Sequence, residues 1–259
     1  MDGRRSIDLN ADVGEAADAE GIAVERELLT MVTSVNVACG GHAGDAHSMR
    51  ATVAAAVARA VRVGAHPSYP DRTGFGRQPM DLAPGALAAS LRHQLGALSD
   101  IAHQCGTSIH TVKAHGALYG EVALGGDAWA ALVLAVRTSC PPGTLVVLPA
   151  GSPVVALADQ AGLDVLEEGF CDRAYRPDGG LVDRRQAGSV YDDPAQAAHQ
   201  AVGLAVDGRV ALSGGQSLSL RVDTLCVHGD SPGAVDMARA VCRALEEAGI
   251  GRAAATASA

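Results

Sequence analysis

The stretch SVNVACGGHAGDAHSMRATVAAAVARAVRVGAHPS, residues 34–68, decides the fold. Two short apolar runs, 34–40 and 63–68, have the length and composition of buried strands, and the segment 45–62 between them has those of a helix. Two strands joined by one helix of this length form a βαβ unit, in which the strands lie parallel. The stretch therefore predicts a parallel sheet covered by helices.

Short apolar runs alternate with helical segments along the rest of the chain as well. Further strands are expected at residues 6–12, 110–116, 144–150, 164–170 and 224–230, and further helices at 24–32, 84–105, 127–138, 153–162, 193–207 and 232–249. Seven strands linked in this way form either a closed barrel or an open sheet, and periodicity does not decide between them. Since no linker rich in Pro, Gly or Ser divides the chain, we expect one β/α domain over residues 1–250 and a disordered tail over 251–259.

Composition excludes several classes of protein. The net charge of -9 disfavours binding to nucleic acid, whose phosphates repel an acidic surface. The sequence begins without an apolar signal segment, and no apolar run approaches the roughly 20 residues that span a bilayer. None of the six cysteines forms a CxxC pair, so a structural zinc site is not expected. We therefore expect a cytoplasmic protein that is bound to neither nucleic acid nor membrane.

Polar residues gather where the predicted strands end. Five of the seven strands are followed by a histidine, or by a carboxylate with an arginine. Singly, each has a plainer interpretation: a histidine there can bond a carbonyl, and an aspartate can cap the next helix. Jointly they predict a functional site, because parallel β/α folds place ligands at the carboxyl ends of their strands. The residues concerned are Asn10, Asp12, Glu15, His42, Asp45, His66, Arg72, Lys113, His115, Glu168, Asp172, Arg173, His228 and Asp230.

Lys113 is the single lysine of the chain and lies in the apolar segment TVKAH. A surface position is the default for a lysine. In a strand that is covered on both faces, however, a lysine has to point into the site or into the barrel interior. There it is suited to bind a carboxylate or a developing oxyanion.

Two metal-binding arrangements are compatible with the histidines. His42 and His47 are five residues apart with Asp45 between them, but two side chains at this spacing diverge on a helix. A set drawn from separate strands, Asp12, His42, His66 and His228, fits a catalytic metal better, provided that one coordination position stays open. The sequence leaves open whether a metal binds.

The common nucleotide and hydrolase motifs are absent. The sequence contains no Walker A motif, no correctly spaced GxGxxG and no GxSxG elbow. A self-contained P-loop ATPase and a dinucleotide enzyme are therefore disfavoured.

Six segments carry a resemblance to a known family. IDLNADVGE, VNVACGGHAGD, GAHPSYPDRTGFGR, VKAHGALY, FCDRAYRPDGGLV and LCVHGD, spread from residue 7 to about residue 248, resemble the LamB/YcsF family in the family's order. Gly41, Ala114, Gly120 and Cys171 depart from the family pattern. The resemblance implies an α/β fold, a seven-stranded, distorted TIM-like β/α barrel similar to glycoside hydrolase/deacetylase folds. It also implies ATP-dependent hydrolysis of a cyclic amide, 5-oxo-L-proline, to L-glutamate together with 5-oxoprolinase subunits B and C, with ATP and Mg²⁺ used mainly by those partners.

Roles for the site residues follow from that reaction as hypotheses. Lys113 is assigned to the lactam oxygen or its phosphate, His115 or His228 to proton transfer, and Asp12 or Asp230 to orienting that imidazole. Arg173 or Arg72 is assigned to the substrate carboxylate. The remaining substrate-binding candidates are Asn10, Glu15, His42, Asp45, His66 and Asp172.

Two other functions stay open. One is a stand-alone, metal-dependent deacetylase or amidohydrolase acting on a polysaccharide or a cyclic amide. The other is a non-catalytic subunit that binds a carbohydrate or lactam and scaffolds its partners. A homo-oligomer is compatible with each of these functions.

Overall fold

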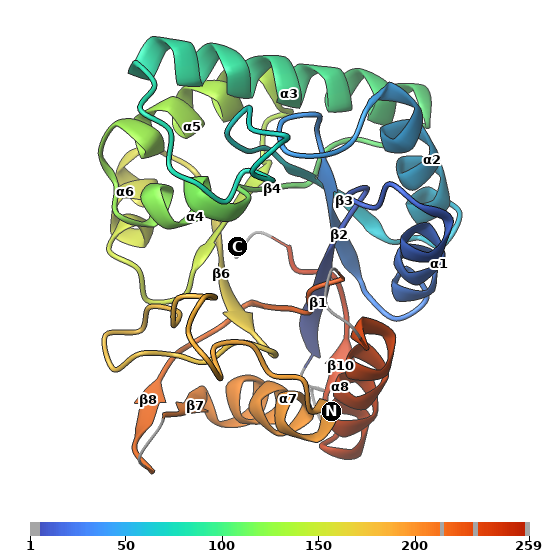
Figure 1. Cartoon of the computed structure of the whole chain (residues 1–259), viewed down its shortest axis with the longest axis vertical. Coiled ribbons are helices and arrows are strands. Elements are labelled where there is room, and N and C mark those ends of the chain that lie inside the picture. The colour runs from blue at the N-terminus through green and yellow to red at the C-terminus, as the bar shows by residue number, and fades with distance from the viewer. Residues whose placement is uncertain (1–5, 213–214, 230–232, 257–259) are drawn as a thin grey trace.

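The computed structural model describes residues 6–212, 215–229 and 233–256. Within these ranges, parallel strands form a closed barrel with helices around its outside (Figure 1). The order around the barrel is β1-β2-β3-β4-β5-β6-β9, and β9 pairs with β1 to close the ring. The strands are β1 (Ser6–Val13), β2 (Ser34–Ala38), β3 (Arg62–His66), β4 (Thr111–Lys113), β5 (Leu145–Pro149), β6 (Val165–Phe170) and β9 (Thr224–Cys226). The seven-stranded β/α barrel is thereby confirmed.

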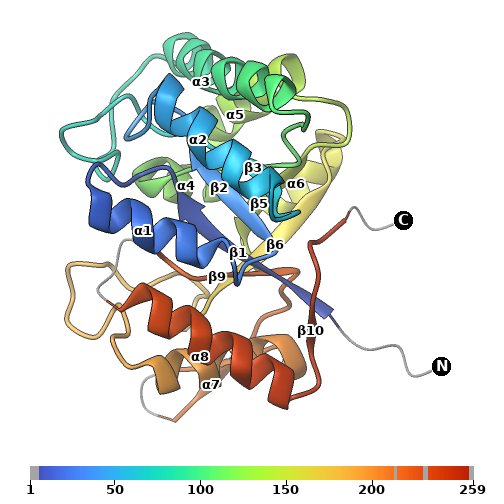
Figure 2. The same ribbon diagram turned by 90° about the vertical axis from the view of Figure 1, so that its right-hand side faces the viewer.

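The helices cover the outer face of this barrel (Figure 2). They are α1 (Ala19–Leu28), α2 (Ala46–Val57), α3 (Pro84–Gln104), α4 (Gly116–Ala123), α5 (Gly126–Ser139), α6 (Val154–Gln160), α7 (Pro194–Val202) and α8 (Ala234–Glu247), and a π-helical turn, Gly203–Asp207, continues α7. Local signals define several of their starts. Asp45 and Asp193 cap α2 and α7 by accepting hydrogen bonds from backbone N–H groups, and Pro84 occupies the first turn of α3.

Three elements were not predicted. Helix α4 begins directly after β4 without a capping side chain, and a short antiparallel hairpin forms from β7 (Arg209–Ala211) and β8 (Ser217–Ser219). The third element is β10 (Gly251–Arg252), which pairs in parallel with the start of β1.

Strand β1 shows how the barrel wall is built. Leu9, Ala11 and Val13 are fully buried in the hydrophobic core between the barrel and the helices. The alternating residues Asp8, Asn10 and Asp12 are also buried, yet they bond to side chains of other barrel strands. This alternation follows from the strand repeat of two residues. The inward face of β1 is therefore polar, whereas its other face packs in the apolar core between the barrel and the helices.

The C-terminal segment covers the amino end of the barrel. Ala255 packs on Leu145, Val147 and Leu166, which form a small apolar cluster separate from the main core. Its carbonyl oxygen accepts a 2.8 Å hydrogen bond from Arg62 Nη1. The prediction of a disordered tail is therefore wrong for residues 251–256, because this cluster needs a cover. Residues 257–259 lie outside the described residues.

No single helix of the described ranges is both long and apolar enough to cross a membrane. Helices α4 and α5 taken together meet that test of length and composition, as a pair bent by 106°.

Candidate active site

A pocket of about 590 Å³ opens at the carboxyl ends of the barrel strands. This volume lies within the usual range for small-molecule sites. The predicted site residues that line the pocket are Asp12, Glu15, His66, Lys113, His115, Arg173 and His228. The clustering at this end of the barrel, which was expected from the strand ends, is thus present in the structure.

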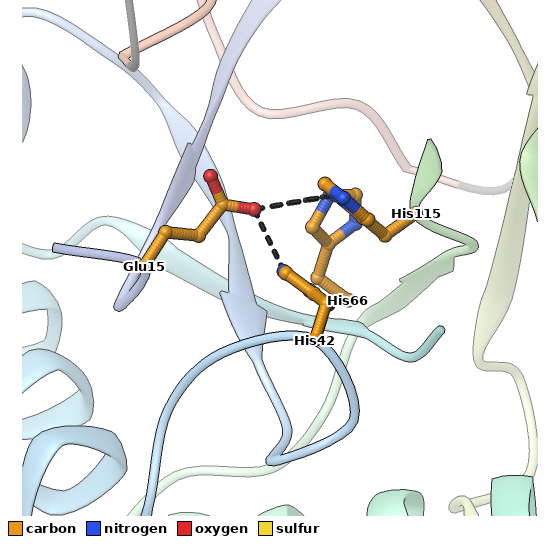
Figure 3. Close-up of side chains that lie close together, drawn as sticks. All are labelled: Glu15, His42, His66 and His115. Atoms are coloured by element: carbon orange, nitrogen blue, oxygen red, sulfur yellow. Dashed lines mark hydrogen bonds and ion pairs between the residues drawn. The ribbon is translucent and has the colours of Figure 1, made fainter. Parts of the chain in front are cut away.

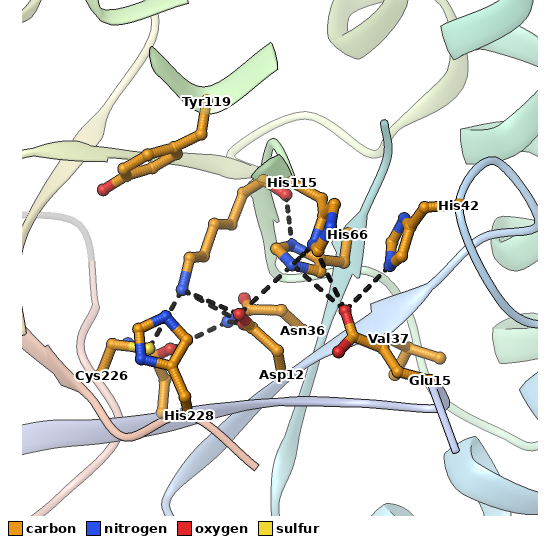
Figure 4. Close-up of polar contacts among 12 residues, drawn as sticks. Asp12, Glu15, Asn36, Val37, His42, His66, His115, Tyr119, Cys226 and His228 are labelled. Carbon is orange, nitrogen blue, oxygen red and sulfur yellow. Dashed lines mark hydrogen bonds and ion pairs between the residues drawn. The ribbon is translucent and has the colours of Figure 1, made fainter. Parts of the chain in front are cut away.

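Lys113 contacts side chains of β1, β6 and β9, and two of these partners, Asp12 and Cys226, are labelled in Figure 4. Its Nζ atom is 3.1 Å from Asp12 Oδ1, 2.9 Å from Glu168 Oε1 and 3.2 Å from Cys226 Sγ. Burial lowers the pKa of Lys113, but the charge of Asp12 and the other acidic neighbours raise it well above its usual value. Burial also raises the pKa of Asp12, and the charges of His66 and Lys113 outweigh it and hold that pKa well below its usual value. The lysine therefore stays charged, with two carboxylates to balance it.

Four side chains converge beside this ion pair, and we call them the three-histidine cluster: Glu15, His42, His66 and His115 (Figure 3). Glu15 Oε1 is 2.8 Å from His42 Nε2 and 3.3 Å from His115 Nδ1. The rings of His42 and His115 stack with their centroids 3.6 Å apart, and His66 meets both rings edge-on. These ligand atoms all lie within 4.8 Å of one another, so the cluster has the composition and spacing of a metal site.

The protonation states within the cluster differ. Burial lowers the pKa of His42 to about 4 and also lowers the pKa of His115. Burial acts in the same direction on His66, but the charge of Asp12 outweighs it and raises the pKa of that ring. In Glu15, burial raises the pKa, and hydrogen bonds from His115 and His42 outweigh it and lower the pKa. Two neutral imidazoles therefore face an ionised carboxylate near neutral pH.

The polypeptide backbone approaches this cluster closely at Gly76. A Cβ atom at that position would lie 3.1 Å from atoms of both His42 and His115, and the φ angle of +62° is one that side chains disfavour. Glycine is therefore required where loop 67–83 closes over the two stacked rings.

A second arrangement, the Asp172–His228 pair, lies on the opposite side of the pocket. His228 Nδ1 donates to Asp172, with both carboxylate oxygens at 2.9 Å. The ring of Phe170 stacks on the imidazole with centroids 5.5 Å apart. Burial raises the pKa of Asp172, but the charge and hydrogen bonds of His228 outweigh it and lower that pKa. With Nδ1 held in this way, Nε2 is the ring nitrogen left for a substrate.

Arginine side chains form the outer part of the pocket. Arg173 donates to the backbone oxygens of Ser189 and Val182, and burial together with the nearby Arg184 lowers its pKa to about 10. Arg77 and Arg176 line the same pocket. A pocket with this rim suits an anionic ligand.

Several predicted site residues lie elsewhere. Asn10 is buried below the pocket and donates to Glu168 Oε1 and Thr224 Oγ1, so it positions other side chains. Asp45 is exposed, its carboxylate caps α2, and it does not line the pocket. Asp230 lies outside the described residues.

Arg72 and His47 also lie outside the pocket lining. Arg72 is exposed and donates to the backbone oxygens of Gly40 and Gly44, so it braces the loop that carries His42 instead of lining the pocket. His47 is exposed on α2 and belongs to neither histidine group.

The predicted metal set of Asp12, His42, His66 and His228 is divided between two groups. His42 and His66 belong to the three-histidine cluster, whereas Asp12 and His228 gather with Cys226. The structure therefore does not support binding of one ion by all four predicted residues.

Two residues that contact the charged groups of the site, Tyr119 and Cys226, were missed by the sequence analysis. Tyr119 donates a 2.7 Å hydrogen bond to Glu168 Oε2, and it lies on α4, a helix that was not predicted. Cys226 contacts Lys113 from β9. The sequence did contain a signal for the cysteine. Cys226 lies two residues after the polar Thr224, and residues two apart in a strand share the same face.

A closed β/α barrel with charged and imidazole side chains at the carboxyl ends of its strands is the architecture of an enzyme. A model of the LamB/YcsF family matches residues 7–259, and the chain belongs to this family.

Curated relatives match nearly the whole chain, and each of the two described here is named as the A subunit of 5-oxoprolinase. The chain is 45% identical over 244 residues to such a protein from Pseudomonas syringae pv. tomato, covering 94% of this chain and 95% of the relative. It is 47% identical to the relative from Paracidovorax citrulli, covering 94% of this chain and 97% of that one.

Solved structures agree with the fold. The crystal structure of the lactam utilization protein from Thermus thermophilus has a TM-score of 0.89 and 40% identity, covering 96% of this chain and all of that one. The Xyl-CE4 domain of a multidomain xylanase from the hindgut metagenome of Trinervitermes trinervoides has a TM-score of 0.53 at 11% identity, covering 96% and 87% of the two chains. The latter is a likeness of fold alone.

Proposed function

We propose that this chain acts as the A subunit of a 5-oxoprolinase, which cleaves 5-oxo-L-proline to L-glutamate with ATP and with partner subunits B and C. The observation that carries the proposal is the similarity to relatives of that name, 43% to 47% identical over at least 94% of this chain. The pocket supports it, because basic side chains at its rim suit a small anionic substrate.

The reaction has to overcome amide resonance. Transfer of the γ-phosphoryl group of ATP to the lactam oxygen makes the ring carbon electrophilic and releases ADP. Attack of water on that carbon and cleavage of the ring C–N bond open the ring, and the nitrogen takes up a proton as it leaves. The resulting γ-glutamyl phosphate is hydrolysed to glutamate and phosphate.

Lys113 is the group assigned to the oxygen that carries charge. Its ammonium is already balanced by Asp12 and Glu168, which suits a hydrogen-bond donor to a developing oxyanion better than a binder of the substrate carboxylate. Arg173 is assigned to that carboxylate. Tyr119 holds Glu168 from the other side and so positions the lysine.

His228 is the group assigned to the leaving nitrogen. Its Nδ1 atom is held by Asp172, which takes the orienting role that the sequence had given to Asp12 or Asp230. An imidazole fixed in this way presents Nε2 as the proton donor or acceptor. His115 is less suited to this role, because both of its ring nitrogens already have partners.

ATP, with Mg²⁺, is assigned mainly to the partner subunits, since the sequence of this chain has no Walker A motif. The cytoplasmic location remains a prediction from the sequence.

The deciding experiment measures glutamate formed from 5-oxo-L-proline with ATP, using this chain alone, the B and C subunits alone, and all three together. We expect turnover only in the full mixture. His228→Asn should lower that turnover by about 10²-fold while the variant still co-elutes with B and C in size-exclusion chromatography. No turnover in the complete mixture, with assembly intact, would contradict the proposal.

A second candidate function is favoured by the three-histidine cluster alone: a stand-alone, metal-dependent amidohydrolase or deacetylase. It predicts hydrolysis of a cyclic amide or an acetylated sugar without ATP or partners, and loss of that activity on treatment with a chelator. Metal-loaded chain that shows no such activity would exclude it.

A further inference from the structure

The three-histidine cluster is assembled from four consecutive strand ends. Glu15 follows β1, His42 follows β2, His66 is the last residue of β3, and His115 follows β4. The distances between their facing atoms are 2.8 Å from Glu15 Oε1 to His42 Nε2, 3.3 Å from Glu15 Oε1 to His115 Nδ1, and 3.0 Å from His66 Nε2 to His115 Nδ1. Ligand atoms around a tetrahedral zinc ion lie ~3.3 Å apart, given metal–nitrogen bonds of about 2.0–2.1 Å.

The tautomers of two rings are fixed by backbone carbonyls. His66 Nδ1 lies 2.8 Å from Lys113 O, and His115 Nε2 lies 2.9 Å from Phe75 O. A carbonyl oxygen only accepts hydrogen bonds, so these two ring nitrogens carry the protons. The other nitrogens, His66 Nε2 and His115 Nδ1, then face each other and point into the cluster. At this distance of 3.0 Å, a metal ion bound to both nitrogens would take the place of the proton that otherwise joins them.

The backbone that fixes His115 is itself unusual. Phe75 has a φ of +53°, in the left-handed region that costs an L residue free energy. This conformation presents the Phe75 carbonyl to His115. Metal-binding histidines in general donate their second ring N–H to a carbonyl or carboxylate, which fixes the tautomer and orients the ring.

The charges around the cluster also leave room for a cation. Asp12 and Glu168 contact the ammonium of Lys113, whereas the carboxylate of Glu15 contacts the imidazoles of the cluster. Asp12 Oδ2 is 3.3 Å from His66 Nε2, and therefore within reach of an ion bound there. A divalent cation balances the group, whereas uncompensated buried carboxylates are costly.

We propose that Glu15, His42, His66 and His115 bind one divalent transition-metal ion of the zinc class. Three imidazole nitrogens and one carboxylate oxygen are the donors that such ions prefer over Mg²⁺ or Ca²⁺. Glu15, His66 and His115 line the pocket and His42 lies behind them, so the ion sits in the pocket wall. An oxygen atom of a pocket ligand can reach it there as a further ligand.

The test measures binding directly and does not depend on the proposed activity. The untagged chain is stripped with a chelator and titrated with Zn²⁺ by calorimetry and with Co²⁺ by visible absorption. We expect one equivalent of metal per chain, a Co²⁺ spectrum of a four- or five-coordinate site, and a raised Tm with Zn²⁺. His115→Ala and Glu15→Gln should each lower the affinity at least 100-fold.

Two variants serve as controls. His47→Ala removes an exposed histidine outside the cluster and should bind as the wild type does. Cys226→Ser tests the neighbouring group of Asp12, Cys226 and His228, and should also keep its affinity. Circular dichroism of each stripped variant establishes whether it is folded. If a histidine variant does not fold, the comparison uses Glu15→Gln, which keeps the shape of its side chain.

The proposed metal site would be overturned if the folded wild-type chain bound neither Zn²⁺ nor Co²⁺. Loss of the metal in Cys226→Ser with retention in His115→Ala would overturn it as well. Neither result bears on ATP-dependent turnover of 5-oxoproline, which is measured separately with the partner subunits.

Discussion

The two sides of the pocket use the same residue types in opposite ways. In the three-histidine cluster, three imidazoles share the carboxylate of Glu15, and backbone carbonyls turn two ring nitrogens toward each other. On the other side, the imidazole of His228 has the carboxylate of Asp172 to itself. Imidazole nitrogens that converge on one point suit a cation, whereas a ring with its own carboxylate suits proton transfer. The number of imidazoles per carboxylate thus distinguishes a ligand site from an acid–base site.

The largest effect is expected where the two sides meet, at Lys113. Lys113→Met should lower kcat for 5-oxoproline in the assembled enzyme by roughly 10³-fold, the scale of a lost oxyanion donor. It should also reduce the free energy of unfolding by about 3–5 kcal/mol, because Asp12 and Glu168 lose their buried cation. Steady-state assays and urea unfolding measure the two effects.

A double variant separates the two consequences of that change. Lys113→Met with Glu168→Gln should regain part of the stability, since one uncompensated carboxylate is gone, but none of the activity. Near-normal turnover of the single variant would remove the lysine from the mechanism.

On the acid–base side, His228→Asn and Asp172→Asn should each lower kcat by about 10²-fold with little change in KM, as is typical for loss of a proton-transfer group. Metal affinity should not change in either variant. Asp236→Asn, on the exposed face of α8, is the matched control. If the metal affinity fell as far as kcat, the two sides of the pocket would have to be treated as one site.

The same pair should be visible in the pH dependence of stability. The pKa of Asp172 is lowered in the folded state by His228, against the effect of burial. Such a carboxyl group stabilises the fold above its unfolded pKa of about 3.9, and this contribution is lost as the pH falls through the folded value. The free energy of unfolding should therefore drop less between about pH 6 and pH 3 in Asp172→Asn than in the wild type. Equal drops would show that the pair contributes no acid-sensitive stability.

A smaller effect is expected at Arg72, which braces the loop carrying His42 through Gly40 and Gly44. Arg72→Ala should lower metal affinity by roughly 10-fold, the scale of a lost supporting contact, and change the free energy of unfolding by less than about 0.5 kcal/mol. Arg59→Ala, which removes a hydrogen bond within its own helical region, should leave metal affinity unchanged. An unchanged affinity in Arg72→Ala would show that the loop holds His42 without this brace.

The smallest effect is expected at Asp45. Asp45→Ala should lower the Tm slightly through loss of the α2 cap, with no change in turnover or metal affinity. Asp45→Ser, which keeps a capping oxygen, should recover most of that loss in thermal unfolding. A drop in kcat in both variants would return Asp45 to the substrate-binding set.

Much of the fold was predictable because the barrel strands are buried on both faces. Runs such as 144–150 and 34–40 therefore stand out from the helices between them. Barrel closure was not predictable from periodicity, because it depends on β1 pairing with β9 near the other end of the chain. The hairpin of β7 and β8 was missed, since each of its strands has only three residues.

The candidate site was likewise predictable in part. That polar side chains would gather was predictable, because the carboxyl ends of parallel strands share one end of the barrel. Which carboxylate would pair with which basic side chain was not predictable, because the pairing depends on side-chain directions across the interior. Asp12 pairs with Lys113, and Asp172 pairs with His228. That Asp45 and Arg72 would lie outside the pocket lining was not predictable either, because sequence distance from a strand end does not show which way a loop turns.

The cover at the amino end of the barrel bears on how the chain folds during synthesis. The ribosome makes strand β1 long before two of its partners, β9 and β10. Contacts between such distant segments slow folding, because a long loop must be ordered before they form. We therefore expect the ring to stay open, with the inward carboxylates of β1 exposed to water, until the ribosome has released the C-terminal segment.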